Sequence, residues 1–474
     1  MKTECIAEQL EFQGIGARCV VADFAAGHVT SDAGALLLRE YDARRRIIQR
    51  LAECFEDYRD PERTEFGVAG LLAQRVIAIA LGYEDVNDHD TLRNDPLLAV
   101  CAGREDVEGA QRRRERDKGS PLAGKSTLNR LEVCAERGGE TKRYHRLTAD
   151  FEKIDALLVE LFLESFAAAP AEIILDFDTT DALLHGLQEE RFFHGYYDAW
   201  CYTPLYVFCG DILVAVEMLS AHNSAVVPAH FVLRRLIAQI RARFPRVRVI
   251  VRGDSGFGDD LLMCLCEREG LDYVFGLQGN ARLDRRIQDE KALARRLCQE
   301  TGRPARVFCE FAYKPVKTWD RERRVVAKAE HLPDGPNPRF VVTSLGADEY
   351  DPRALYEGLY CARGNMENRI KEQQLDLFAD RCSTHWIRSN TLRLYEHAFA
   401  YVLVSGLRRE ALAGTPMEKS TCASIRLRLF KIGALVRVSV RRVCVHMSSA
   451  HPWQDVFQKA FAAMRTPPPR PAPG

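Results

Sequence analysis

The chain has 474 residues, 46% of them hydrophobic, and carries 67 Lys and Arg residues against 67 Asp and Glu residues. A formal net charge of zero excludes binding of nucleic acid through bulk charge alone, although it leaves room for segregated basic patches. No apolar run approaches the roughly 20 residues that cross a bilayer, so no membrane partner is expected.

Cysteine usage points to a reducing compartment. The 15 cysteines include no CxxC pair, and the first residues lack the apolar core of a signal peptide. These features predict reduced thiols in a cytoplasmic protein and argue against a structural zinc site.

Residues 1–170 are predicted to form a mainly helical region. Apolar residues recur at helical spacing after Ser31, a plausible N-cap, and again in two later segments. The charged stretch 104–119 predicts an exposed loop. The expected helices cover 33–55, 67–83 and 150–166.

Residues 171–279 change to alternating strands and helices. The order of strand, strand, strand, helix, strand, helix and strand is that of a mixed-sheet nuclease core of the RNase H type. The expected strands are 172–178, 204–209, 212–219, 246–252 and 273–277, and the expected helices are 226–243 and 259–269.

The remaining chain divides into three predicted regions. Charged, strand-like residues 280–350 predict an inserted β-rich subdomain, and residues 351–411 return to helix as part of the core. Residues 412–474 form a basic C-terminal region whose Pro-rich tail is expected to be disordered. The fold class is therefore α/β, an RNase H-like mixed-sheet core with an inserted β-rich subdomain and a mainly helical N-terminal region.

Carboxylates follow two of the predicted core strands, and a third acid lies on a predicted helix. Asp176 and Asp178 end the first strand on one side of it, Asp254 follows the strand 246–252, and Glu367 lies in the helical segment. Oxygen ligands suit Mg²⁺, and a pair of such ions performs phosphodiester chemistry. Taken singly, each acid also fits a turn, a helix cap or a surface salt bridge, so the hypothesis depends on their combination.

Seven long stretches of the sequence are specific enough to compare with known families. They are TSDAGALLLRE, ALGYEDVNDHDTLRNDPLL, LAGKSTLNRLE, HGYYDAWCYTPLYVFCGD, VRGDSGFGDDLLM, DYVFGLQGN and KIGALVRVSVRRV. These stretches resemble bacterial insertion-sequence transposases of the DDE type, close to the family numbered thirteen-eighty. The resemblance implies an RNase H-like core with a β insertion before the last catalytic acid, and Mg²⁺-dependent cleavage and joining of transposon ends. It also implies a bacterial, nucleoid-associated protein.

Carried over residue by residue, the resemblance implies Asp178, Asp254 and Glu367 as the catalytic, metal-binding acids. They would hold two Mg²⁺ ions, with Mn²⁺ as a substitute. Asp176 remains the alternative to Asp178 as the first ligand, and Asp181 is assigned a supporting role.

The wider group carries a Tyr-x2-Arg-x3-Glu-x6-Lys signature around the glutamate. Tyr360 and Arg363 fit it in spacing, but Gln374 stands at the lysine position. Lys371, one helical turn earlier, is the candidate substitute. Arg363 and Glu367 are four residues apart and share a helix face, so Arg363 is expected to contact the phosphate at the cleaved end.

Two windows combine arginines with a complete absence of acids, namely 218–253 with seven arginines and 421–450 with six basic residues. Such patches bind phosphates without reading sequence. Solvated surface is the competing interpretation for each. The named candidates in the second window are Arg437, Arg441 and Arg442, with Arg437 and Arg441 expected on one side of a strand.

Aromatic residues that could stack on an extruded base are Trp200, Trp319 and Trp386, although core packing is the stronger expectation for each. The segment 119–126 matches a phosphate-loop pattern, but the charged residues before it cannot form the required strand, so ATP binding is not expected.

The expected partners are the double-stranded terminal repeats of the transposon and target DNA, bound by a homodimer or higher oligomer. A Mg²⁺-dependent nuclease without strand transfer and a catalytically inactive DNA-binding protein are the alternatives. The sequence does not specify the repeat and target sequences, the cleavage intermediate, the oligomeric state off DNA or the helix that reads the end.

Overall fold

The computed structural model describes residues 9–133, 146–222, 224–315 and 318–465. It divides into two compact units, and each is considered by itself. Unit 1 combines Met1–Ala149 with Phe399–Pro467, and the described part of unit 2 is Asp150–Ala398. The long helix α13 (Ile387–Ala411) contains the boundary.

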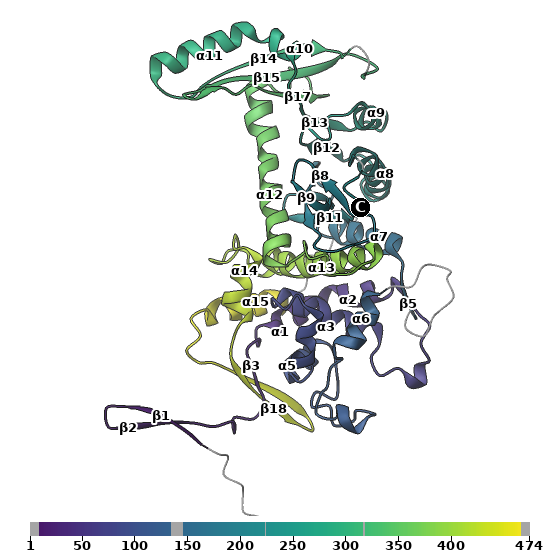
Figure 1. The fold of residues 1–474 in the computed structure, drawn as a ribbon, viewed down its shortest axis with the longest axis vertical. Helices are drawn as coiled ribbons and strands as arrows, with labels where there is room; N and C mark the ends of the chain where they lie inside the picture. The colour runs from purple at the N-terminus through teal and green to yellow at the C-terminus, as the bar shows by residue number, and fades with distance from the viewer. Residues whose placement is uncertain (1–8, 134–145, 223, 316–317, 466–474) are drawn as a thin grey trace, which may run out of the picture. The chain divides into compact units, whose positions relative to one another are not determined.

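A mixed sheet of nine strands forms the centre of unit 2 (Figure 1). Its order is β11-β10-β6-β12-β13-β17-β15-β14, with β16 paired to β15. Pairing is parallel between β6, β12 and β13 and antiparallel elsewhere. The strands are β6 (Glu172–Thr179), β10 (Leu205–Cys209), β11 (Ile212–Glu217), β12 (Arg248–Gly253), β13 (Asp272–Leu277), β14 (Ala305–Tyr313), β15 (Arg323–Leu332), β16 (Gly335–Pro336) and β17 (Arg339–Thr343).

Side chains alternate across this sheet and give it two hydrophobic faces. Val249 and Val251 of β12 pack into a large core, whereas Ile250 between them packs into a smaller core on the other face. Figure 1 shows α8 and α9 on one side of β12 and β13, and the helical run that contains α12 on the other. The helices of unit 2 include α7 (Phe151–Leu163), α8 (Val226–Arg243), α9 (Asp260–Arg268), α10 (Ala281–Arg286), α11 (Gln288–Thr301) and α12 (Gly364–Lys371).

The strands and helices expected between residues 171 and 279 are confirmed, with ends that differ by at most two residues. The segment 280–350 differs from the expectation. It begins with two helices, α10 and α11, and its strands extend the central sheet instead of forming a separate one. A small sheet of order β7-β9-β8 follows β6 and consists of β7 (Ala182–Leu183), β8 (Phe192–His194) and β9 (Ala199–Tyr202).

Unit 1 is helical at its centre, and strands occur at its edges. The expected helix after Ser31 starts only at Ala35 and breaks at Arg46, which adopts a left-handed conformation with φ of 54°. The helices are α1 (Ala35–Arg45), α2 (Ile47–Ala52), α3 (Val68–Ala80), α4 (His89–Leu92), α5 (Pro96–Cys101), α6 (Lys125–Glu132), α14 (Cys422–Ile425) and α15 (Gln454–Arg465), with short 3-10 turns η1 (Pro61–Arg63), η2 (Val86–Asp88) and η3 (Glu115–Asp117) and the π-helical turn η7 (Arg426–Phe430).

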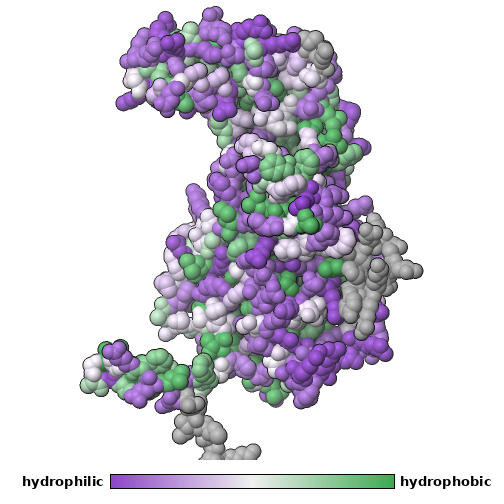
Figure 2. All heavy atoms as spheres, in the orientation of Figure 1, coloured by the Kyte–Doolittle hydropathy of each residue, from purple (hydrophilic) through white to green (hydrophobic). Residues whose placement is uncertain are grey.

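Strands also occur in this unit, part of which was predicted to be mainly helical. They form three small antiparallel sheets, β1-β2, β4-β5 and β19-β18-β3. Every residue of β1 is exposed, including Phe12 and Ile15, and Figure 2 shows hydrophobic residues on the surface of this hairpin. The strands are β1 (Leu10–Ile15), β2 (Arg18–Ala22), β3 (Val29–Thr30), β4 (Phe55–Asp57), β5 (Leu147–Ala149), β18 (Ala434–Ser439) and β19 (Arg442–Met447).

No described helix is long and apolar enough to cross a membrane. The described cysteines are free thiols, as expected. The Pro-rich tail predicted to be disordered lies outside the described residues.

Candidate active site

Two strands of the central sheet bring Asp178 and Asp254 to neighbouring positions. Ile173, Leu175 and Phe177 of β6 point into the large core, so Asp176 and Asp178 lie on the opposite face. The parallel register pairs Gly253 with Phe177. Asp254 is the next residue, so it leaves β12 beside Asp178.

Asp176 is engaged in a buried ion pair. Both of its carboxylate oxygens accept from Arg252 of the neighbouring strand, at 2.6 and 2.7 Å, and the two side chains are 3% and 8% exposed. Arg252 also donates to the backbone oxygen of Leu359, at 2.6 Å. Asp176 therefore ties β6 to β12 and to the helical run above them, whereas Asp178 is the carboxylate that faces the other acids.

Glu367 lies on a continuous helical run over the same face of the sheet. The run consists of a π-helical turn η4 (Ala354–Tyr360), a 3-10 turn η5 (Cys361–Arg363), α12 and a second π-helical turn η6 (Glu372–Asp376). Leu355 and Leu359 anchor it in the smaller core, and α12 contacts β6. Insertions of π-helix are frequent at functional sites.

Arg363 joins the helix to the sheet. Its guanidinium donates to Asp178 Oδ2 at 2.8 Å and to Glu367 Oε1 at 3.3 Å. Burial raises the pKa of Asp178 from 3.8 to about 6, the negative charges of Asp254 and Glu367 act in the same direction, and Arg363 opposes them. The three acids thus form one electrostatic cluster, in which Arg363 is the compensating cation.

Tyr360 packs into this cluster from the start of the run. Burial raises its pKa, and both Arg363 and Asp254 act on it electrostatically. Its hydroxyl lies where a side chain at Gly276 of β13 would be: a Cβ there would be 2.7 Å from the Tyr360 hydroxyl oxygen and 2.7 Å from the backbone nitrogen of Ser255.

We expect Gly276→Ala to disturb the packing of Tyr360 against β13 and the backbone after Asp254. The added methyl group must push either Tyr360 or the backbone that follows Asp254, and such overpacking typically destabilises by about 1–3 kcal/mol. Thermal unfolding is the measurement. Gly279→Ala is the control, because a Cβ at Gly279 would meet only Phe340 carbons, at 3.7 and 3.9 Å. Equal unfolding temperatures for the two variants would contradict the expectation.

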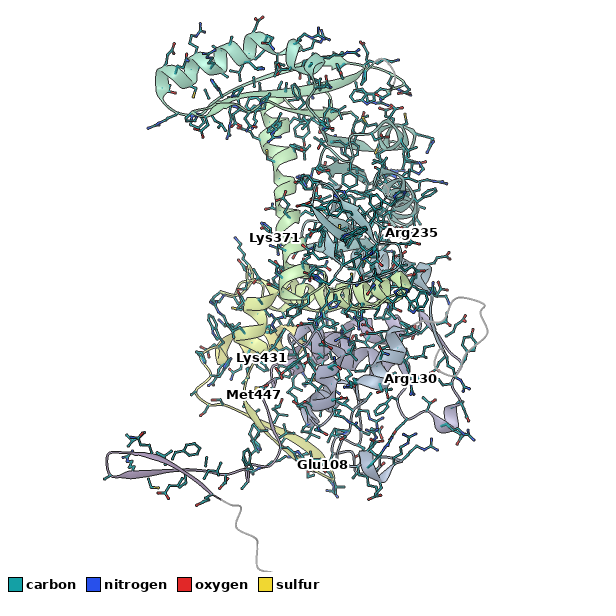
Figure 3. All side chains as sticks on the ribbon, viewed as in Figure 1. Glu108, Arg130, Arg235, Lys371, Lys431 and Met447 are labelled. Atoms are coloured by element: carbon teal, nitrogen blue, oxygen red, sulfur yellow. The ribbon has the colours of Figure 1, made fainter. Side chains whose placement is uncertain are left out.

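Gln374, the departure from the signature, contacts the end of β6. Its amide donates to the backbone oxygen of Asp181 at 2.8 Å, and its oxygen accepts from the hydroxyl of Thr180 at 3.2 Å. Lys371 is exposed at the end of α12 (Figure 3). The side chain that reaches the strand of the first acid is therefore Gln374.

The carboxylate oxygens of Asp178, Asp254 and Glu367 are farther apart in this structure than the ligands of one metal ion would be. Within the described residues, a group with donor atoms within 4.8 Å of one another is formed by Asp260, Cys264 and Asp320, not by the three predicted acids. The guanidinium of Arg323 already neutralises that group, because it donates to Asp260 and Asp320 at 2.7 and 2.9 Å. The donor chemistry of the predicted acids nevertheless suits a hard divalent ion, and Arg363 supplies the positive charge that such an ion would bring.

Three of the seven arginines in the expected basic window 218–253 are neutralised. Arg235 pairs with Asp155, Arg252 pairs with Asp176, and Arg248 donates to an acid outside the window at 2.8 Å. Three others, Arg234, Arg243 and Arg246, are exposed, so the window keeps positive charge on the surface.

The later part of the second basic window forms the hairpin of β18 and β19 in unit 1. Arg437 lies on β18 and Arg442 begins β19, but Arg441 belongs to the turn between them. The prediction that Arg437 and Arg441 share a strand face was wrong, because the alternating run VRVSVRR folds back after Ser439. The three arginines are exposed and form no ion pair within the described residues.

The three candidate tryptophans differ in how far their side chains are buried. Trp319 is 7% exposed and packs in the core, as expected, whereas Trp200 and Trp386 are 44% and 54% exposed, so core packing was wrong for these two. Residues 119–126 follow a 3-10 turn and not a strand, which agrees with the prediction that they form no phosphate loop.

Several residues of the site were missed in the sequence. Arg252 could have been noticed, because its position two residues before Asp254 matches that of Asp176 before Asp178. Tyr197 gave no signal, yet burial and the charges of Asp181 and Asp178 raise its pKa to about 12.

Fold and site together define an α/β protein with an acidic cluster where the carboxyl ends of its central parallel strands meet a helix. A family model described as transposase DDE domain group 1 matches residues 12–469. The chain therefore belongs to this family of DDE transposases, which are enzymes that act on DNA. Comparison with curated proteins returned no match.

Proposed function

We propose that the protein is a transposase that cleaves DNA at the ends of an insertion sequence and joins the freed 3′-OH to a second phosphodiester. The observation that supports this most directly is the cluster of Asp178, Asp254 and Glu367 around Arg363, in a chain of the DDE family. The proposed subgroup is the insertion-sequence family numbered thirteen-eighty.

The proposed core is RNase H-like. Counted in chain order, the first five strands of the central sheet have the spatial order third, second, first, fourth and fifth. The acids leave the two central strands of this set, and Glu367 comes from the helix after the inserted residues 280–350. This is the arrangement that the family resemblance implies.

The three acids would hold Mg²⁺, or Mn²⁺ in its place. When bound, two such ions would supply Lewis-acid activation of the attacking oxygen and stabilisation of the leaving oxygen. The raised pKa of Asp178, about 6, means that burial and the neighbouring acids disfavour its ionised form, and a bound cation would favour that form. Tyr360 would fix the orientation of Arg363 and of the backbone after Asp254.

DNA would be held by basic residues of both units. Arg363 would donate its planar guanidinium to the phosphate at the cleaved end. Lys371 would approach the backbone next to it. Arg437, Arg441 and Arg442 of the β18–β19 hairpin would neutralise phosphates elsewhere on a bound duplex, and a homodimer or higher oligomer would assemble on the DNA.

The test is a cleavage and joining assay. The substrate is a duplex that carries the inverted repeat flanking the gene, labelled on each strand, with a plasmid as target. We expect Mg²⁺-dependent nicks at the repeat boundary and joining of pre-cut 3′-OH ends to the plasmid. Cleavage without joining would favour a nuclease, and binding without cleavage would favour a DNA-binding protein without catalytic activity.

A further inference from the structure

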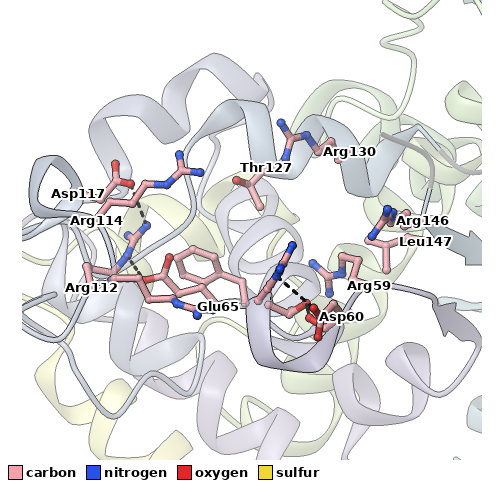
Figure 4. Close-up of a pocket in the computed structure, with 14 residues that line it drawn as sticks. Arg59, Asp60, Glu65, Arg112, Arg114, Asp117, Thr127, Arg130, Arg146 and Leu147 are labelled. Carbon is pink, nitrogen blue, oxygen red and sulfur yellow. Dashed lines mark hydrogen bonds and ion pairs between the residues drawn. The ribbon is translucent and has the colours of Figure 1, made fainter. Parts of the chain in front are cut away.

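Unit 1 contains an open cavity of about 720 Å³ at the junction of four chain segments (Figure 4). The segments are the turn around η1, the loop that leads into η3, the exposed side of α6 and the start of β5. The lining residues are Arg59, Asp60, Arg63, Thr64, Glu65, Phe66, Arg112, Arg113, Arg114, Asp117, Thr127, Arg130, Arg146 and Leu147.

Arginine dominates this lining, with seven arginines against three carboxylates. The carboxylates are already paired: Asp60 with Arg63 at 3.3 Å, Glu65 with Arg112 at 2.6 Å, and Asp117 with Arg93 at 3.0 Å. The lining therefore keeps an excess of positive charge that its own acids do not cancel.

Two of the arginines build the walls. Arg112 is buried and donates to the backbone oxygen of Leu122 at 3.0 Å as well as to Glu65. Arg59 is held by both carboxylate oxygens of Asp57, at 2.8 and 2.6 Å. These contacts fix the loops. Two more of the lining arginines also have partners, because Arg63 pairs with Asp60 and Arg113 donates to the backbone oxygen of Glu62.

Arg114 and Arg146 are the lining arginines best placed to bind a ligand. Both are exposed, and within the described residues neither side chain has an ion-pair or hydrogen-bond partner. They come from segments on opposite sides of the cavity, with Arg130 on the same side as Arg146 (Figure 4). Guanidinium groups facing one opening from two sides can bind successive phosphates of one strand.

The lining has no surface suited to a base. Its aromatic residue, Phe66, is 8% exposed and is covered by the guanidinium groups of Arg104 and Arg112, at 4.8 and 4.7 Å from the ring centroid. A free nucleotide would need stacking or apolar contact that this lining lacks. A DNA backbone needs only positive charge and donors, which are what the lining provides.

We propose that this cavity binds the phosphates of a DNA strand and is the surface by which unit 1 holds the end of the element. The choice of DNA as the ligand rests on the proposed function. The arginines would fix the position and orientation of the duplex and would not read its sequence.

The test is binding of a labelled duplex in EDTA, which prevents cleavage, over a range of salt concentrations. Arg114→Ala combined with Arg146→Ala should weaken binding roughly tenfold or more at 0.1 M salt and reduce the salt dependence of log K by about 2. Arg116→Ala is the matched control, because Arg116 is exposed in the same loop but does not line the cavity. It should bind like the unmodified protein.

A second variant separates charge from folding. Arg114→Lys combined with Arg146→Lys keeps both charges and should recover most of the salt dependence. If the Lys variant is as weak as the Ala variant, or if the Ala variant binds like the unmodified protein, the inference is overturned.

The inference and the proposed function fail separately. Unchanged duplex binding by the Ala variant, while the unmodified protein cleaves and joins DNA, would remove the inference alone. Reduced salt dependence in a protein that never cleaves DNA would support the cavity as a DNA surface and remove the proposed function alone.

Discussion

Glu367→Gln is expected to reduce metal-dependent DNA cleavage by about a thousandfold or more. The substitution keeps the size of the side chain but removes one of the three negative charges of the proposed metal site. Metal ions contribute several kcal/mol of transition-state stabilisation, and each 1.36 kcal/mol is a factor of ten in rate. Cleavage of a labelled end duplex in Mg²⁺ measures the effect.

Glu357→Gln is the matched control for this experiment. Glu357 lies on the same helical run, but it pairs with Arg306 and Arg353 and not with the acidic cluster. Its variant should cleave at the normal rate, and both variants should bind the duplex in EDTA. Normal Mg²⁺-dependent cleavage by Glu367→Gln would remove this residue from the proposed metal site.

The core of unit 2 could be predicted from sequence because its strands are short, apolar and well bounded. The strand 172–178 alternates around an apolar centre and ends in acids, and the helix 226–243 separates two such runs. The spacing of two between Asp176 and Asp178 places both on one face, but it does not show which of them faces the other acids. That choice depends on Arg252, whose contact with Asp176 forms only when β6 and β12 pair.

Local charge counts overstate the free positive charge where ion pairs form between distant elements. The window 218–253 has no acid of its own, yet Asp155 and Asp176 lie on other elements and neutralise two of its arginines. The converse holds for the stretch 104–119, which was predicted only as an exposed loop. Its arginines lie against two other segments and line a basic cavity, and no local pattern distinguishes the buried Arg112 from its neighbours.

The helix α11 was missed for a different reason. Its buried side chains are only Ala294 and Cys298, both small, so its apolar stripe is too thin to give a helical period. The strands that follow were predicted, but their membership of the central sheet depends on the pairing of β17 with β13, across more than sixty residues of chain. Sequence periodicity carries no information on such pairings.

Asp176→Asn is expected to destabilise the metal-free protein by about 3 kcal/mol. The substitution removes one partner of a buried ion pair and leaves the Arg252 charge uncompensated between β6 and β12. Chemical denaturation in EDTA at pH 7.5, followed by a signal from unit 2, measures the change. The loss of stability should occur without any requirement for DNA or metal.

The same substitution two residues later, Asp178→Asn, should have the opposite sign and stabilise by up to about 3 kcal/mol. The difference between the two sites is that Arg363 keeps Glu367 as a carboxylate partner when Asp178 is replaced, whereas Arg252 loses the carboxylate with which it is paired when Asp176 is replaced. The pKa of Asp178 is about 6 in the folded protein against 3.8 for the ordinary group, so the folded state binds the proton more tightly. The ionised carboxylate therefore opposes folding by an amount that is absent below pH 4, grows between pH 4 and 6 and is complete above pH 6. Asparagine has no such charge, so the stabilisation should appear at pH 7.5 and vanish at pH 4. Equal effects of the two variants at pH 7.5, or a gain for Asp178→Asn that does not change with pH, would contradict the assignment of Asp176 to structure and Asp178 to the acidic cluster.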